Sequence, residues 1–155
     1  MPRTSTARSP VRGVGRPPVQ VGADRVRLPL SGPRVRSIVE AVLRGERRAA
    51  AVAVTFVGPT AMRRLHRKWK GGDRATDVLA FAWQSPGAGL TGDIYVCAAV
   101  ARRQAVEFGV PWRQEVARLV IHGTLHLLGY DHADGAGRSR SAMWRRQERY
   151  VKALA

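Results

Sequence analysis

Apolar side chains along this 155-residue chain follow two different spacings. Between residues 33 and 44 they recur every three or four positions, which predicts an amphipathic helix that ends at Gly45. Residues 50–57 are rich in β-branched side chains, which favours a strand. The same patterns predict three more strands, at 19–21, 77–83 and 93–97, and four more helices, at 60–69, 98–108, 111–128 and 139–154.

Residues with special backbone preferences divide these segments. Thr60 is expected to cap the helix that follows Pro59, and Gly71 and Gly72 are expected to break it. A glycine-rich stretch at 84–92 is expected to form the loop between two strands. Together these segments predict a single small α+β domain with a mixed sheet of about four strands packed with about five helices.

The first 18 residues differ in composition from the rest of the chain. They contain no acidic residue and almost no large apolar one, and such a segment cannot bury enough surface to offset its ordering entropy. We expect a disordered basic arm at 1–18 and a folded domain at 19–155. An arm that contacts RNA and a misassigned start codon are the alternatives, while the prolines argue against a helical transit peptide. The arm contains Arg3, Arg8, Arg12 and Arg16, interspersed with Pro2, Pro10, Pro17 and Pro18.

Three of the four histidines lie in one segment, HGTLHLLGYDH. His122 and His126 are four residues apart, so they project from one face of a helix on successive turns. Gly129 allows a left-handed turn at the helix end, which would return His132 toward the same point. Three imidazoles around one centre leave a fourth position open on a tetrahedral metal, which is the arrangement of a catalytic zinc site. We therefore expect one zinc ion per chain, with a zinc-bound water as the reactive species.

This spacing also occurs in metzincin proteases, which carry a glutamate general base directly after the first histidine. Here that position is Gly123, so the ligand set is shared without the base. Asp131 is expected either to hydrogen-bond a ligand imidazole and fix its tautomer or to cap a turn. Glu115 lies seven residues before His122 on the same helix face, but its neighbour Arg118 favours an ordinary surface ion pair.

The segment HGTLHLLGYDH, together with TDVLAF at 76–81 and GDIYVC at 92–97, resembles the signature of the YbeY family of bacterial endoribonucleases. The resemblance covers residues 19–154. It implies that His122, His126 and His132 hold zinc and that the chain is a hydrolase that cuts single-stranded RNA. It further implies a role in ribosomal RNA processing, at the 3′ end of the small-subunit RNA, and in ribosome quality control. The implied partners are ribosomal RNA and the small ribosomal subunit, in the cytoplasm and without a small-molecule cofactor.

The loop before TDVLAF departs from the family pattern. Lys70 stands where the family has a functionally important arginine, and lysine keeps the charge but lacks the planar bidentate fork. We expect Lys70 to position an RNA phosphate; the alternative is a solvated lysine at a helix end. Ala75 and Ala80 replace a usual proline and serine, which affects loop stiffness and one hydroxyl contact.

The composition favours an acidic polymer as partner. With 27 Lys and Arg against 11 Asp and Glu, the formal charge is +16, and such a surface attracts polyanions. Charge alone is also compatible with anionic lipid or with a coding bias. The single cysteine, Cys97, cannot form an intrachain disulfide and is expected to be a small buried residue in a reducing compartment. Because no apolar run approaches the ~20 residues of a membrane span, no membrane association is expected.

Two other functions fit part of this pattern. A non-catalytic ribosome-assembly factor would use a structural zinc only to stabilise its fold, and no general base is obvious in the sequence. A metzincin-like metalloprotease would need the glutamate that position 123 lacks. Trp69, Trp83, Trp112 and Trp144 are candidates for stacking on RNA bases, although tryptophans at helix and strand positions more often belong to the core.

Overall fold

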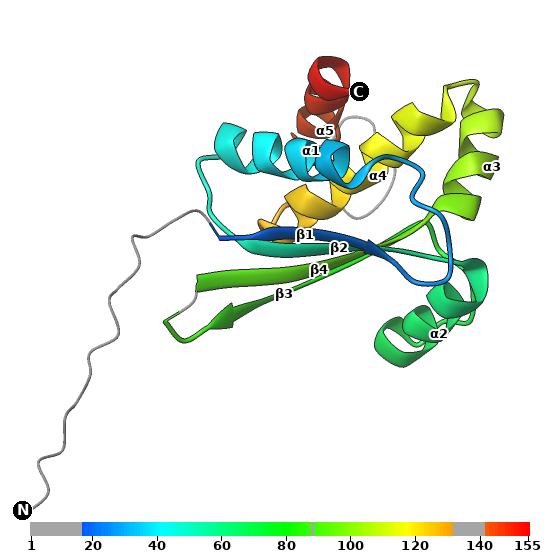
Figure 1. Ribbon diagram of the computed structural model, residues 1–155, viewed down its shortest axis with the longest axis horizontal. Coiled ribbons are helices and arrows are strands. Elements are labelled where there is room, and N and C mark those ends of the chain that lie inside the picture. The colour runs from blue at the N-terminus through cyan, green and yellow to red at the C-terminus, as the bar shows by residue number, and fades with distance from the viewer. Residues whose placement is uncertain (1–16, 88, 132–141) are drawn as a thin grey trace, which may run out of the picture.

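A computed structural model describes residues 17–87, 89–131 and 142–155 of the chain, which form one sheet with helices on both faces (Figure 1). These residues contain four strands and five helices, so the predicted α+β class is confirmed. In chain order the elements are β1 (Val19–Ala23), α1 (Gly32–Gly45), β2 (Ala51–Val57), α2 (Pro59–Lys70), β3 (Val78–Ser85), β4 (Gly89–Cys97), α3 (Ala98–Phe108), α4 (Trp112–Leu127) and α5 (Ala142–Leu154).

The sheet has the strand order β1-β2-β4-β3 and is mixed, as predicted. The first two strands pair in parallel, β2 and β4 also pair in parallel, and β3 runs antiparallel to β4 at one edge. The expected loop at 84–92 is wrong, because the strands continue through most of it and Ser85 pairs with Gly89. Cross-strand pairing therefore overrides the low strand propensity of the glycines.

The two faces of the sheet are covered unequally. Helices α1 and α4 pack on one face, with α5 behind α4, and α2 lies under one end of the other face (Figure 1). The main core lies on the first face and includes the fully buried Phe56, Ile94 and Ile121. A smaller cluster around Met62 and Cys97 joins α2 to the sheet, and Cys97 is buried as predicted.

Two glycines bring α4 close to β4. A Cβ atom at Gly123 would lie 2.7 Å from Cγ2 of Ile94, and one at Gly92 would lie 2.6 Å from the methyl carbons of Leu127. Neither position leaves room for a side chain unless the helix or strand moves. Gly123 therefore faces the sheet, and the glutamate that a metzincin needs at this position would collide with β4.

The ends of the helices agree only in part with those predicted from the sequence. The expected cap at Thr60 is wrong, since Gly58 is the N-cap of α2 and Pro59 occupies the first turn. Proline fits there because it lacks the amide hydrogen that the first turn leaves unpaired. Gly71 ends the helix in the left-handed conformation, with φ of 72°, as the sequence predicts. Residues 1–16 of the expected basic arm at 1–18 and the expected start of the last helix at 139–141 lie outside the described residues.

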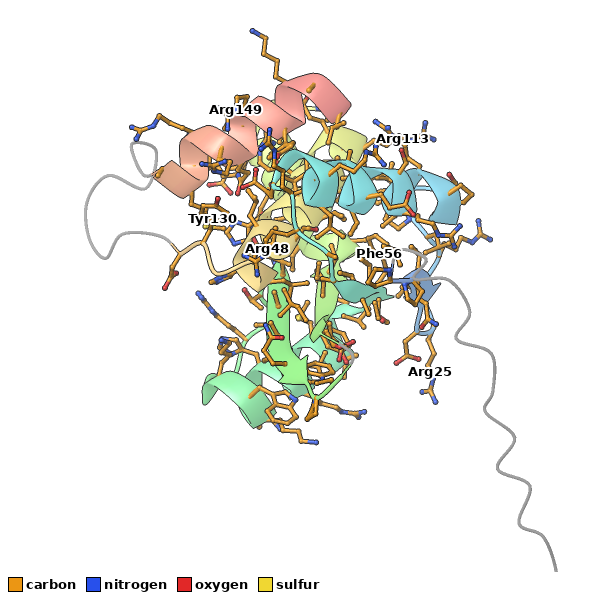
Figure 2. The ribbon with its side chains drawn as sticks, turned by 90° about the vertical axis from the view of Figure 1, so that its left-hand side faces the viewer. Arg25, Arg48, Phe56, Arg113, Tyr130 and Arg149 are labelled. Carbon is orange, nitrogen blue, oxygen red and sulfur yellow. The ribbon has the colours of Figure 1, made fainter. Side chains whose placement is uncertain are left out.

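None of the described helices combines the length and the apolar character that crossing a membrane would require. Exposed arginines project from several sides of the molecule (Figure 2). Arg25 follows β1, Arg48 follows α1, Arg113 lies in the first turn of α4 and Arg149 lies in α5. The positive charge is thus spread over the surface and does not by itself locate a site for a polyanion.

Candidate metal centre and its cavity

The last turns of α4 carry the first two histidines of the motif. His122 and His126 stand edge to face, with 5.6 Å between their ring centroids and an interplanar angle of 75°. His122 is half-buried and His126 is exposed. The expected projection of both rings from one helix face is therefore present in the structure.

Helix α4 ends directly after these histidines, at Leu127. Gly129 has φ of 97°, and its amide donates to the carbonyl of His126 at 3.0 Å while the amide of Tyr130 donates to that of Leu125 at 3.2 Å. This pair of hydrogen bonds is a Schellman motif, which the sequence predicts from the glycine. His132 lies outside the described residues, and among those described no three metal-binding side chains come together. The three-histidine site therefore stays a prediction, and the structure describes two of its three residues.

Gln147 of α5 orients the first histidine. Its Oε1 lies 2.8 Å from Nδ1 of His122, and its Nε2 donates to Glu148 at 3.3 Å, which turns the amide oxygen toward the imidazole. An amide oxygen only accepts, so Nδ1 carries the hydrogen and the lone pair is on Nε2. Zinc-binding histidines commonly hold this arrangement, in which an outer acceptor sets the tautomer. The residues present therefore fit a divalent metal at the end of α4.

A buried charge network continues from Gln147 along the two helices. The guanidinium of Arg118 donates to Glu148 at 2.8 Å and to Glu115 at 2.6 Å. The side chain of Glu115 is only 3% exposed, so the expectation of a surface ion pair is wrong in its location, although the pair itself forms. Burial alone would lower the pKa of Arg118, but its bonds to Glu148 and Glu115 more than offset this and raise it. The two carboxylates around one guanidinium give this group of three side chains a net negative charge.

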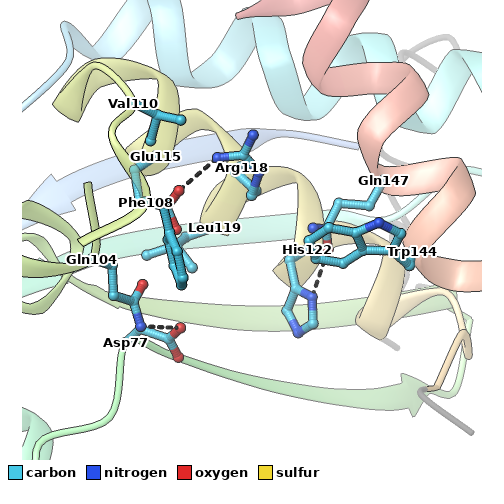
Figure 3. A pocket seen from close by; sticks show the side chains of 10 residues that line it. All are labelled: Asp77, Gln104, Phe108, Val110, Glu115, Arg118, Leu119, His122, Trp144 and Gln147. Carbon is cyan, nitrogen blue, oxygen red and sulfur yellow. Dashed lines mark hydrogen bonds and ion pairs between the residues drawn. The ribbon is translucent and has the colours of Figure 1, made fainter. Parts of the chain in front are cut away.

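His122 also borders a cavity of about 460 Å³ between α3, α4, α5 and the start of β3 (Figure 3). Asp77 lies on its floor, where Oδ1 accepts from the amide of Val78 at 2.7 Å and Oδ2 accepts from Gln104 at 3.1 Å. The cavity therefore joins a carboxylate, an amide and an imidazole beside aromatic walls. The remaining lining residues are Phe108, Val110, Glu115, Arg118, Leu119, Trp144 and Gln147.

A second polar cluster anchors the turn that follows α4. Glu46, at the end of α1, accepts from Tyr150 at 2.6 Å and from Nη1 of Arg146 at 3.1 Å, and Arg146 lies 4.8 Å over the ring of Tyr130. Burial alone would raise the pKa of Glu46, but bonds from Tyr150 and Tyr130 and the charge of Arg146 hold it below its usual value. Burial of Tyr150 and its hydrogen bond to Glu46 raise the pKa of Tyr150 to about 12. This cluster ties α1 and α5 to the residue that follows Gly129.

Of the other expected site residues, Lys70 lies apart from the two described histidines. Lys70 is exposed at the end of α2, with Nζ 5.7 Å from the ring centroid of Phe81. Phe81 belongs to the cluster on the α2 face of the sheet, so Lys70 lies across the sheet from α4. Asp131 is exposed and is the last described residue before His132, so its contact to a ligand imidazole stays a prediction.

Known proteins that resemble this chain include endoribonucleases. The family model described as Endoribonuclease YbeY matches residues 28–155. The chain belongs to the YbeY endoribonuclease family. An Endoribonuclease YbeY of Desulfitobacterium hafniense is 38% identical over 133 residues, which cover 79% of this chain and 83% of that protein. One of Aromatoleum aromaticum is 41% identical over 113 residues, covering 72% and 70%.

A solved structure shares the fold. The solution structure of TM1509 from Thermotoga maritima superposes with a TM-score of 0.60 at 28% sequence identity, and the match covers 88% of each chain. Membership of the YbeY family confirms the expected enzyme class, a nuclease hydrolase that acts on RNA. A metal requirement is general in this family, whereas the identity of the metal belongs to the proposal below.

Several side chains at this site were missed in the sequence. Gln147 and Glu148 lie in a helix of otherwise ordinary amphipathic pattern, 25 and 26 residues beyond His122, and no local signal links them to it. Asp77 stands inside the TDVLAF segment, which was a usable signal, yet its side chain received no role. Glu115 is predicted to lie at the surface, because the sequence does not show which segments bury it.

Proposed function

We propose that this chain is a zinc-dependent endoribonuclease that cleaves single-stranded RNA during ribosomal RNA processing, at the 3′ end of the small-subunit RNA, and in ribosome quality control. The observation that carries the proposal is the pairing of His122 with Gln147 beside an open cavity. It supplies an oriented metal ligand at a place where a polymer can enter. The proposed partners are ribosomal RNA and the small ribosomal subunit, in the cytoplasm.

Each residue has a defined part in this proposal. His122, His126 and His132 hold one zinc ion, and Gln147 fixes the tautomer of the first of them. When bound, zinc supplies a Lewis acid that activates water and offsets charge on a phosphoryl oxygen. Asp131 is proposed to support a ligand imidazole.

The phosphodiester must be held while the bond is cut, and cationic side chains supply this contact. Lys70 is proposed to contact a phosphate of the strand beyond the cavity, because its ammonium is exposed and lies beside the edge strand β3. A formal charge of +16 adds a general attraction for RNA. The single point charge of a lysine positions a phosphate more loosely than an arginine fork does.

A cleavage assay tests the proposal. Zinc-loaded protein is incubated with end-labelled single-stranded RNA, duplex RNA and casein, each with and without chelator. We expect endonucleolytic products from single-stranded RNA alone, lost with chelator and restored by zinc. His126→Ala should give no products, while His66→Ala, the same substitution on α2 across the sheet, should retain them.

Each other result has a clear meaning. RNA that is bound but never cut would contradict the enzyme and favour the assembly factor. Cut casein would favour a protease. Cleavage that persists in metal-free protein would show that the reaction does not require the metal.

A further inference from the structure

Four aromatic side chains lie together on the face of the sheet that α2 covers. We define this aromatic surface as Trp69 at the end of α2, Phe81 and Trp83 on β3, and Tyr95 on β4. The ring centroids of Trp69 and Phe81 are 5.7 Å apart, and those of Phe81 and Tyr95 are 6.3 Å apart. Trp83 is two residues after Phe81 and so projects from the same face of the strand.

The aromatic surface is open to solvent. Trp69 is 57% exposed and Trp83 is 46% exposed, although tryptophan is usually buried for most of its area. Figure 1 shows that α2 covers one end of this face and that the hairpin of β3 and β4 extends beyond it. Trp112, by contrast, is half-buried, donates to the carbonyl of Ala98 and stacks on Arg102. The structure thus separates the tryptophans, which the sequence could not do.

Cations border the aromatic surface on the side of α2. Nζ of Lys68 lies 5.0 Å from the ring centroid of Trp69, and Nζ of Lys70 lies 5.7 Å from that of Phe81. Asp93, the strand partner of Phe81, faces the same side of the sheet and places a carboxyl group there. A bound anion would therefore lie near the two lysines and away from Asp93 at the centre of β4.

We propose that the aromatic surface binds single-stranded RNA, with bases stacked on Trp69 and Trp83 and the adjoining phosphates held by Lys68 and Lys70. Rings that offer a flat face, next to ammonium groups, are the combination that binds unpaired nucleotides without strong sequence preference. The proposal rests on the proposed function, since it extends the path of that substrate beyond the metal centre.

The position of β3 allows one RNA strand to contact both faces of the sheet. This strand is an edge of the sheet, and its residues face the two sides alternately. Val78 and Ala80 pack against the core under α4, whereas Leu79 and Phe81 face α2. A strand of RNA that crosses the open edge of β3 can therefore reach the histidines on one side and the aromatic surface on the other.

Fluorescence anisotropy with a labelled single-stranded RNA of roughly 20 nucleotides tests the proposal. Chelator is present, so that the RNA stays intact. We expect Trp69→Leu and Trp83→Leu each to weaken binding by about tenfold and the double variant by more, because leucine stays apolar but has no stacking face. Trp69→Phe and Trp83→Phe should retain most of the affinity. Leu28→Ala, which alters an exposed apolar side chain elsewhere, should bind like wild type.

Duplex RNA and a parallel cleavage assay complete the test. Duplex RNA should bind all variants equally, because its bases are not free to stack. Thermal unfolding should change little in the leucine variants, since Trp69 is 57% exposed and Trp83 is 46% exposed. Wild-type affinity in the double leucine variant would overturn the proposal and would favour a protein partner for this surface.

If wild type cuts no RNA although the variants bind RNA weakly, the proposed function is wrong, but the assignment of the aromatic surface to RNA binding is supported. If wild type cuts RNA and all variants bind alike, only the aromatic surface fails.

Discussion

The two faces of the sheet are organised in opposite ways. On the α4 face the polar groups are buried and paired, from Gln147 and His122 to Arg118 and its two glutamates. On the α2 face Trp69 and Trp83 are exposed. The ammonium groups of Lys68 and Lys70 lie over aromatic rings of the same surface. Both faces carry groups that suit RNA chemistry, but one holds them in place and the other leaves them free to adjust.

This difference matches what each task requires. A metal ligand must keep its tautomer and direction, and these come from packing and hydrogen bonds in a second layer of residues. A stacking surface must accept any base in several positions, and an exposed ring does this at small entropic cost. Changes on the α4 face should therefore act on metal binding or stability, and changes to the exposed side chains on the α2 face should act on RNA binding and cleavage without altering zinc content.

The largest effect is expected from His126→Ala. Loss of a direct ligand should reduce zinc content sharply and reduce cleavage by more than the roughly 10–100-fold that loss of an outer contact costs. Folding of the metal-free protein should be unaffected, because the side chain is exposed. Elemental analysis beside His66→Ala is the measurement. Equal zinc in both variants would contradict the assignment of the α4 face as the metal centre.

A smaller loss is expected from Gln147→Leu, which removes the acceptor at Nδ1 of His122. Zinc affinity should fall by roughly 10–100-fold, and Gln147→Glu should restore much of it because a carboxylate also accepts. Gln104→Leu is the matched control, since it lines the same cavity but bonds to Asp77. Competition with a fluorescent zinc chelator measures the affinity. A loss of equal size in the control would assign the effect to the cavity as a whole.

Glu46→Gln should act on stability without altering metal ligands. At pH 7 the variant should lose about 2 kcal/mol in the free energy of unfolding, the scale of hydrogen bonds to a charged group. The folded pKa of Glu46 is lowered, so its contribution is complete above the unfolded pKa and is lost as pH falls through the folded value. The difference from wild type should therefore shrink below about pH 4.5.

Urea unfolding of the metal-free proteins at pH 7 and at acidic pH is the measurement for Glu46. Glu107→Gln, an exposed glutamate on α3, serves as the control and should match wild type at both. A difference from wild type that stays constant with pH would show that the carboxylate charge is not what stabilises the cluster.

The smallest effect is expected from Lys70 on the α2 face. Lys70→Ala should reduce RNA cleavage by roughly tenfold, the scale of one charge-assisted contact, and Lys70→Arg should preserve or raise it. Zinc content should not change in either variant, since Lys70 lies across the sheet from α4. Cleavage is compared at one fixed salt concentration with Lys152→Ala, an exposed lysine on α5. An alanine variant as active as wild type would leave Lys70 without a part in the reaction.

The sequence predicted features that depend on neighbours a few residues apart. The spacing of His122 and His126 and the left-handed turn at Gly129 were both readable in one segment, and both are present. The helix at 33–44 and the strand at 50–57 agree with α1 and β2 to within about a residue at either end. The hairpin was predicted too short, because pairing between β3 and β4 stabilises residues with weak strand propensity.

What only the tertiary structure decided was which surfaces meet. Gln147 reaches His122 because α5 packs on α4, and Glu115 is buried only in the assembled fold. The exposure of Trp69 and Trp83 was likewise decided by the assembled fold. Periodicity within a helix or strand is set by backbone geometry and is visible in a short segment. Burial and the orientation of a ligand depend on contacts between segments far apart in the chain, and these exist only once the sheet and its helices have assembled.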